Sequence, residues 1–372
     1  MKWKTNLLHF EDIKKNKMDK NEGMVRRAKD FSNPFNIAGG CMRINKYVTI
    51  ISVALCLSYP FTALAYGHQG HETVGLIAAS LIKGTNAEKQ VKRLLQKDET
   101  LATASEWADC AKGFTYCHAD PTEEMKDFVQ RNPNHHAYHY TDIPFQLRAY
   151  KKGEIGTTPD DVVNIMEDAI RVLKNQPQQN PAHNLKKREA LFVLVHMTGD
   201  IHQPMHVGAA YISEDDEFIV PRNEEEAKST FTQGGNLLCD RSKGVHSYWD
   251  TDLVLRAMRA SKVKNSVELA QVLLTKAKKI KVDPGVATNW PMRWATESLQ
   301  LSELELAPIT VIQKRKAGPG RSPCEASDPN SSNYVWDVRL PDEYGPEGAT
   351  TVTEQLSKAG ARLAWLLRAI WP

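Results

Sequence analysis

The sequence is short of the features that assign a chain to several common classes. Its six cysteines in 372 residues include no C-x-x-C pair, which argues against a zinc site built from thiolates. A formal net charge of +3 is too small for a surface that coats nucleic acid, so any polyanion must be recognised at a local site. No internal repeat and no convincing set of strands is visible. These absences leave a globular protein whose function rests on particular side chains.

What the sequence does have is enough apolar residues for a sizeable core. The chain is 41% hydrophobic and 25% charged, which fits one or two globular domains. Helical periodicity places helices at about 74–81, 88–95, 159–173, 182–201, 246–260, 267–280, 290–306 and 353–370. Residues 317–348 are rich in Pro, Gly and Ser and are expected to form one long loop. We therefore predict an all-α fold with long loops, in a single domain over residues 66–372.

The first 65 residues have the pattern of a removed targeting segment. Arg43 and Lys46 form a positively charged start, residues 47–57 are apolar, and Ala63-Leu64-Ala65 matches a cleavage signal. Residues 42–65 are therefore interpreted as a secretory signal peptide, whose apolar part is too short for a comfortable membrane span. Residues 1–41 are lysine-rich and lack periodicity, so either translation begins at Met42 or they are a leader that is removed.

The mature chain is then expected to begin at Tyr66 and to be secreted or periplasmic, in a compartment where disulfides persist. Four cysteines remain after cleavage, and four cysteines allow three pairings. We favour a local Cys110–Cys117 pair and a long-range Cys239–Cys324 pair.

The most informative stretch is residues 191–206, LFVLVHMTGDIHQPMH. His196 and Asp200 lie four residues apart in an apolar segment of helical length, so both project from one helix face. An ionised carboxylate in such a helix is costly unless it is paired or bound to a metal. A core histidine bonded to a neighbouring acid would also explain the pair. The spacing recurs at His246 and Asp250, however, and His206 follows the first pair, which favours a multinuclear metal site.

The candidate ligands are too many for one zinc ion and enough for two or three. They are the Tyr66 amino terminus, His71, Asp109, His139, His196, Asp200, His206, His246 and Asp250. Imidazole and carboxylate donors without thiolate suit catalytic zinc. The remaining histidines of the mature chain lie off this spacing and are expected to support the ligands from outside or to lie on the surface. They are His68, His118, His135, His136, His183 and His202.

Between the two His–Asp pairs lies a polar stretch, residues 207–235, with acidic runs at 214–217 and 224–226. A calcium site and a solvated loop would each explain the acidic runs, and we expect the loop. Gly234 and Gly235 close the stretch and are expected to let the backbone approach a ligand.

Six motifs together resemble one known family. They are YGHQGH, WADCAK, HYTDIP, HMTGDIHQPMH, GGN and HSYWDTD, in the family's order and spread over residues 66–372. The family is that of the single-strand-specific zinc nucleases and 3′-nucleotidases (type I nucleases, the S-one/P-one family). It is similar in fold to zinc-dependent phospholipase C, an α-helical protein with a trinuclear zinc site.

The resemblance implies a specific set of ligands for three zinc ions. A first ion is implied at Asp109, His139, His196 and Asp200, and a second at His206, His246 and Asp250. The third is implied at the amino nitrogen and carbonyl oxygen of Tyr66, with His71 and a bridging Asp200. The family usually begins with Trp, so Tyr66 departs from it, although the implied ligand atoms belong to the backbone.

Substrate-binding residues are implied in the same way. Lys112, Asp142 and Asn236 match positions that line the phosphate and base pocket, and Tyr140 matches a base-stacking aromatic residue. Asp109, Lys112 and Asp200 are expected to take part in catalysis. Gly244-Val245 stands before His246 where the family usually has Asn-Leu, which puts the contacts of that loop in doubt.

The implied function is hydrolysis of single-stranded DNA and RNA to 5′-phosphorylated products, together with 3′-nucleotidase activity. Two alternatives remain: a phospholipase C with the same zinc core, and a periplasmic protein that buffers zinc without catalysis. The WADCAK lysine and the HYTD and GGN segments fit the nuclease branch. The enzyme is expected to be a monomer without stable membrane association.

Overall fold

The computed structural model describes residues 66–113, 117, 120–318 and 322–372. The expected leader and signal peptide, and also His118, lie outside these residues. The described residues belong to one unit by their internal contacts. Among them, no helix combines the length and the apolar character that crossing a bilayer requires.

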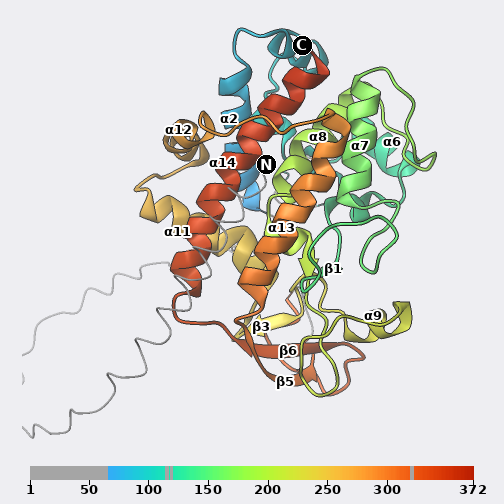
Figure 1. Ribbon diagram of the computed structural model, residues 1–372, viewed down its shortest axis with the longest axis vertical. Coiled ribbons are helices and arrows are strands. Elements are labelled where there is room, and N and C mark those ends of the chain that lie inside the picture. Colours follow the sequence, from blue (N-terminus) through green and yellow to red (C-terminus); the bar gives the residue numbers. More distant parts are fainter. Residues whose placement is uncertain (1–65, 114–116, 118–119, 319–321) are drawn as a thin grey trace, which may run out of the picture. The chain divides into compact units, whose positions relative to one another are not determined.

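Helices make up most of the regular structure (Figure 1). The α-helices are α2 (Gly67–Ile82), α3 (Asn86–Leu94), α4 (Leu101–Ala104), α5 (Trp107–Ala111), α6 (Glu123–Arg131), α7 (Val162–Leu173), α8 (Lys187–Asp200), α9 (Glu224–Thr230), α10 (Val245–Ser247), α11 (Leu253–Ala260), α12 (Ser266–Ala277), α13 (Trp290–Leu306) and α14 (Tyr344–Ile370). Single turns are η1 (His135–His139), η2 (Pro204–His206), the π-helical η3 (Tyr248–Asp252) and η4 (Ala287–Asn289). This content confirms the predicted all-α class.

Helix α8 lies at the centre of the core. It packs against α7 on one side and against α2 and α14 on others, so every residue from Glu189 to Asp200 is buried. A helix that is apolar on all sides is stable only when it is surrounded by other elements. The neighbouring α7 begins where the Asp161 carboxylate accepts hydrogen bonds from the amides of Val163 and Asn164. The core therefore holds α8 rigidly, together with any functional side chain on it.

The expectation of no convincing strands is corrected by a small sheet. Strands β3 (Leu238–Asp240), β4 (Lys243–Gly244), β5 (Thr310–Lys316) and β6 (Tyr334–Arg339) are arranged in the order β4-β3-β6-β5. A separate parallel pair joins β1 (Ile143–Pro144) to β2 (Gly208–Ala209). Strand β6 lies inside the expected 317–348 loop, and it forms because β3, far earlier in the chain, and β5 pair with it. The sheet lies at the end of the molecule opposite the C-terminus (Figure 1).

The long C-terminal helix also differs from expectation, because α14 begins at Tyr344 and not at residue 353. The glycines that argued against helix here serve close packing. A Cβ on Gly345 would come within 2.7 Å of the Tyr248 hydroxyl, and one on Gly348 within 2.7 Å of Leu253 Cδ1. These glycines let α14 approach α11 and η3 closely.

The acidic stretch is partly helical. Glu224–Thr230 forms α9, which begins at an Asn223 cap with three glutamates in its first turn, a favourable position for negative charge. None of these acidic residues belongs to a described group of side chains that could hold a metal ion.

Both expected disulfides are present. Cys110 on α5 is bonded to Cys117, and Cys239 on β3 is bonded to Cys324. The second bond joins the β5–β6 connection to β3. Strand β3 contacts α10, which carries His246.

Candidate metal centre

The C-terminal end of α8 and the turn after it carry three predicted ligands. His196 and Asp200 lie on one face of α8, with His196 Nε2 3.1 Å from Asp200 Oδ2. The chain then turns through η2, which ends at His206. Two serines of α13 hold this turn, since Ser298 Oγ donates to the Ile201 carbonyl and Ser302 Oγ to the Pro204 carbonyl. The turn is therefore fixed by hydrogen bonds as well as by packing.

Asp109 on α5 and His139 on η1 complete a first group around this helix end. His139 Nδ1 lies 3.0 Å from Asp200 Oδ2 and 3.5 Å from Asp109 Oδ1. His196 Nε2 lies 3.6 Å from Asp109 Oδ1. Bonds of about 2.0–2.1 Å to a tetrahedral zinc ion would separate two ligand atoms by roughly 3.3 Å. The four side chains therefore have the spacing of ligands around one ion.

A second group combines His206 with His246 and Asp250. His206 Nε2 lies 3.6 Å from Asp250 Oδ1, and His246 Nε2 lies 3.3 Å from Asp250 Oδ2. Asp250 is in the π-helical turn η3, an irregularity that is frequent at functional sites. The predicted repeat of the His–Asp spacing therefore forms a local cluster, although the helix that carries it is not regular.

His71 and Tyr66, from the start of α2, lie beside both groups. His71 Nε2 is 3.2 Å from Asp200 Oδ1, the oxygen that faces away from His139 and His196. The Tyr66 nitrogen donates to Asp250 Oδ1 at 3.1 Å, and the Tyr66 carbonyl accepts from the Gly70 amide. The Asp200 carboxylate therefore stands between His71 and the first group.

Hydrogen bonds from backbone carbonyls orient three of the imidazoles. The Nδ1 atoms of His196, His206 and His246 lie 2.5, 2.9 and 2.9 Å from the carbonyl oxygens of Ser105, His139 and Gly234. A bond at Nδ1 places the proton there and leaves Nε2 free to bind a metal. Each of these three histidines turns Nε2 toward the cluster.

Gln203 contacts the cluster although its sequence position did not single it out. Its side-chain amide donates to Asp250 Oδ1 at 2.8 Å, so it helps to orient a predicted ligand. The only available signal was its position inside the HMTGDIHQPMH motif, between Asp200 and His206.

Positively charged side chains within the cluster offset the cost of burying its carboxylates. Burial alone would raise the pKa of Asp109, but the Lys112 ammonium, 2.9 Å from Oδ1, and the nearby histidines hold it below its usual range. Burial likewise opposes a low pKa for Asp200, and His196 and His206 overcome it. Burial, followed by the charge of Lys112, lowers the pKa of His139 to about 3. The carboxylates are therefore ionised and depend on nearby positive charge.

Several buried atoms of the cluster make no well-aligned hydrogen bond within the described protein, although Asp109 Oδ1 lies 2.9 Å from Lys112 Nζ and Asp200 Oδ1 lies 3.2 Å from His71 Nε2. They are His71 Nδ1 and Nε2, both carboxylate oxygens of Asp109, Asp200 Oδ1 and His206 Nε2. A buried polar atom without a partner costs roughly 1–3 kcal/mol, so several in one place call for another binding partner. Because the donors are imidazole and carboxylate, that partner fits a divalent zinc ion.

The residues expected to contact substrate lie around the cluster. Tyr140 directly follows His139 and keeps 41% of its surface exposed. Asp142 is only partly exposed, and burial raises its pKa to about 7. Asn236 is exposed and follows Gly235, whose carbonyl accepts from the His246 amide. The Gly234 carbonyl lies 2.9 Å from His246 Nδ1, so the backbone of the glycine pair adjoins a candidate metal ligand.

Three of the other described histidines have partners outside the cluster. His202 is buried with Nδ1 at the Thr198 carbonyl and Nε2 at Arg362. His183 lies against Asp168 and Asp160. His68 bonds Glu106 and also lies near Glu72, a group that is partly exposed.

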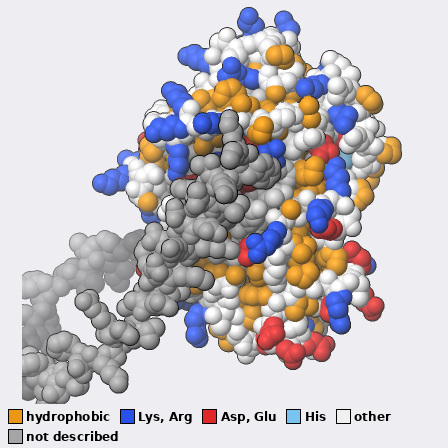
Figure 2. Space-filling view, in the orientation of Figure 1, with side chains coloured by type: hydrophobic (Ala, Val, Ile, Leu, Met, Phe, Trp, Pro, Cys, Tyr) orange, Lys and Arg blue, Asp and Glu red, His pale blue; other side chains and the backbone are white. Residues whose placement is uncertain are grey.

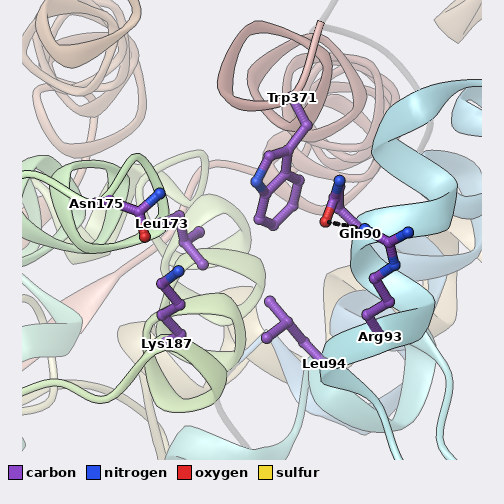
Figure 3. Close-up of a pocket in the computed structure, with 7 residues that line it drawn as sticks. All are labelled: Gln90, Arg93, Leu94, Leu173, Asn175, Lys187 and Trp371. Atoms are coloured by element: carbon purple, nitrogen blue, oxygen red, sulfur yellow. Dashed lines mark hydrogen bonds between the residues drawn. The ribbon is translucent and has the colours of Figure 1, made fainter.

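One surface cavity does not coincide with the ligand cluster. A cavity of about 210 Å³ between α3, α7, α8 and Trp371 (Figure 3) contains none of the candidate ligands and lies at the Lys187 end of α8, away from Asp200. On the face in Figure 2, lysine and arginine side chains are scattered and do not form one continuous patch. The candidate site is therefore marked by the buried ligand cluster and not by this cavity.

Sequence comparisons match the part of the chain that carries these residues to known proteins. The sequence model of the family described as S1/P1 Nuclease matches residues 66–372. Nuclease S1 of Aspergillus oryzae is 24% identical over 305 residues, covering 81% of this chain and 90% of the relative. Endonuclease 2 of Arabidopsis thaliana is 25% identical over 331 residues, covering 87% of this chain and 96% of the relative.

Proposed function

Since this chain belongs to the S1/P1 nuclease family and is a hydrolase of phosphodiester bonds, we propose that it cleaves single-stranded DNA and RNA with three zinc ions and also removes phosphate from 3′-nucleotides. The observation that carries the proposal is the buried cluster centred on Asp200, whose two oxygens face different imidazoles. Such a carboxylate is suited to joining two ions.

The proposed ligand sets follow the three groups of side chains. Asp109, His139, His196 and Asp200 would hold the first ion. His206, His246 and Asp250 would hold the second. The third would be held by the amino nitrogen and carbonyl oxygen of Tyr66, by His71 and by Asp200.

The zinc ions would supply an activated water and positive charge for the phosphate oxygens. The protein's own side chains would place the substrate. Lys112 adds a positive charge beside Asp109, where a phosphate oxygen can bind it. Asn236 offers an amide from the loop that contacts His246.

Preference for single strands would come from Tyr140. Its exposed ring adjoins the first ligand group, where it can stack on a base that has left the duplex. A paired base would have to be unstacked first, at a cost of a few kcal/mol. Asp142, three residues after His139, would contact the same nucleotide.

We also propose that the enzyme is a secreted or periplasmic monomer, free of stable membrane association, and is released by cleavage before Tyr66. Two disulfides support an oxidising compartment.

The test is to secrete the protein, determine its N-terminal residue and zinc content, and assay single-stranded DNA, 3′-AMP and phosphatidylcholine in parallel. We expect about three zinc ions per chain, cleavage of the first two substrates and 5′-phosphate ends on the DNA products. Hydrolysis of phosphatidylcholine alone would instead make the protein a phospholipase C. Zinc binding without hydrolysis would indicate a zinc-buffering protein.

A further inference from the structure

The strand pair β5–β6 carries lysines and aromatic rings in facing positions. The register places Lys316 opposite Tyr334 and Lys314 opposite Trp336. Lys316 Nζ lies 4.1 Å from the centre of the Tyr334 ring, and Lys314 Nζ lies 4.9 and 5.1 Å from the Tyr334 and Trp336 rings. Facing residues in antiparallel strands project from the same side of the sheet, so these four side chains share one face.

The two faces of this strand pair differ in charge. On one face, Arg315 is paired with Asp337 at 2.7 Å, so its charge is neutralised. On the other face, neither Lys314 nor Lys316 forms an ion pair with any carboxylate in the described part of the chain. Because no described carboxylate neutralises these two ammonium groups, they remain available to an anionic partner.

The same face exposes apolar surface. Tyr334 is 42% exposed, whereas Trp336 is only 2% exposed, so Tyr334 supplies the accessible ring. Flat aromatic surface beside mobile cations is the combination by which proteins bind single-stranded nucleic acid, with bases on the rings and phosphates at the cations. We call Lys314, Lys316 and Tyr334 the basic–aromatic face.

This face is connected to the candidate metal centre through the sheet. The Trp336 amide donates to the Leu237 carbonyl, next to Asn236. The Cys239–Cys324 disulfide fixes the β5–β6 connection to β3. In the order β4-β3-β6-β5, two strand spacings separate β3 from β5, roughly 10 Å. A strand bound at Asn236 could therefore continue onto the basic–aromatic face.

We propose that the basic–aromatic face is a binding subsite for single-stranded nucleic acid outside the catalytic pocket. Phosphates contact Lys314 and Lys316, and one base stacks on Tyr334. The inference rests on the proposed nuclease function and adds to it a preference for substrates several nucleotides long. A mononucleotide held at Tyr140 would not reach the face.

The test compares a 20-nucleotide oligo-dT with 3′-AMP as substrates of the zinc-loaded enzyme. Tyr334→Ala should raise KM for the oligonucleotide about 5-fold or more, which corresponds to the lower end of base stacking. Lys314→Ala/Lys316→Ala should raise it further and reduce the slope of log kcat/KM against log salt by about 1.4, since each phosphate contact contributes about 0.7 for single strands. Constants for 3′-AMP should stay unchanged.

The matched control is Lys264→Ala/Lys281→Ala, which removes the same charge from exposed positions on either side of α12, away from the sheet (Figure 1). Lys314→Arg/Lys316→Arg should restore most of the affinity for the oligonucleotide. The subsite is rejected if the face variants match the control on the oligonucleotide, or if they lose activity equally on 3′-AMP. A wild-type enzyme that cleaves neither substrate would instead refute the proposed function.

Discussion

Substitution of Gly199 tests the candidate metal centre from a residue that is not itself a ligand. Gly199 lies on α8 next to Asp200, and a Cβ there would come within 2.6 Å of His71 Nδ1 and 2.8 Å of His71 Cε1. Ordinary contacts of a Cβ begin at 3.4 Å, so the imidazole must shift by about 0.8 Å. The ring is stacked on His196 at 3.9 Å, which limits where it can move. Gly199→Ala should therefore displace His71 from Asp200.

The expected effect on activity is larger than the effect on stability. Ala is favoured over Gly in a helix by about 1 kcal/mol, and overpacking costs about 1–3 kcal/mol, so the net loss of stability should be at most about 2 kcal/mol. A misplacement of about 1 Å at an active site can reduce the rate about 100-fold. We expect a loss of that order in kcat on single-stranded DNA and about one zinc ion fewer per chain, because His71 is proposed as a ligand of the third ion and of neither of the other two.

A second glycine provides the control. A Cβ on Gly360 of α14 would come within 2.5 Å of Ile77 Cβ. Ile77 lies on α2, as His71 does, but it is not a candidate ligand. Gly360→Ala should lower Tm by a similar or larger amount and keep full zinc content and kcat. The assays are Tm by calorimetry, zinc by mass spectrometry and steady-state cleavage at saturating zinc. If Gly199→Ala keeps full zinc content and a kcat within about two-fold of wild type, the position of His71 controls neither zinc binding nor the rate.

Three further predictions concern the ligands and the substrate pocket. Asp200→Asn should abolish cleavage and remove more than one zinc ion, because its oxygens face separate groups; a full zinc complement with a near-normal rate would contradict the bridging role. Tyr140→Ala should raise KM for 3′-AMP roughly 5-fold or more, from about 1–3 kcal/mol of stacking, while zinc content and kcat persist. Unchanged kinetics would mean that the base stacks elsewhere. An extra methionine before Tyr66 should weaken the third zinc site and slow cleavage of single-stranded DNA, since an amide nitrogen is a poor ligand, whereas correctly processed Tyr66→Trp should be nearly harmless. Equal zinc content and rate in the Met-extended and processed forms would exclude the amino-terminal ligand.

The sequence alone determined the features that depend on local spacing. His196 and Asp200 share a helix face because four residues make about one helical turn, and this holds wherever the helix lies. The bounds of α13 follow from periodicity, as does the existence of α7, α8 and α12. Both favoured disulfides were also correct, although only Cys110–Cys117 is a local pair.

Only the tertiary structure decided what depends on partners distant in the chain. Strand β6 was missed because a short strand is stabilised by its neighbours, and β3 comes from far earlier in the chain. The early start of α14 depends on glycines that fit against Tyr248 and Leu253, a contact invisible to local propensity. Asp109 and His139 could be placed beside α8 from the sequence only through family resemblance, because no local rule relates their segments. Packing also brings Gln203 to Asp250 and places two lysines over the rings of β6. The spacing of these residues in the sequence does not indicate either contact.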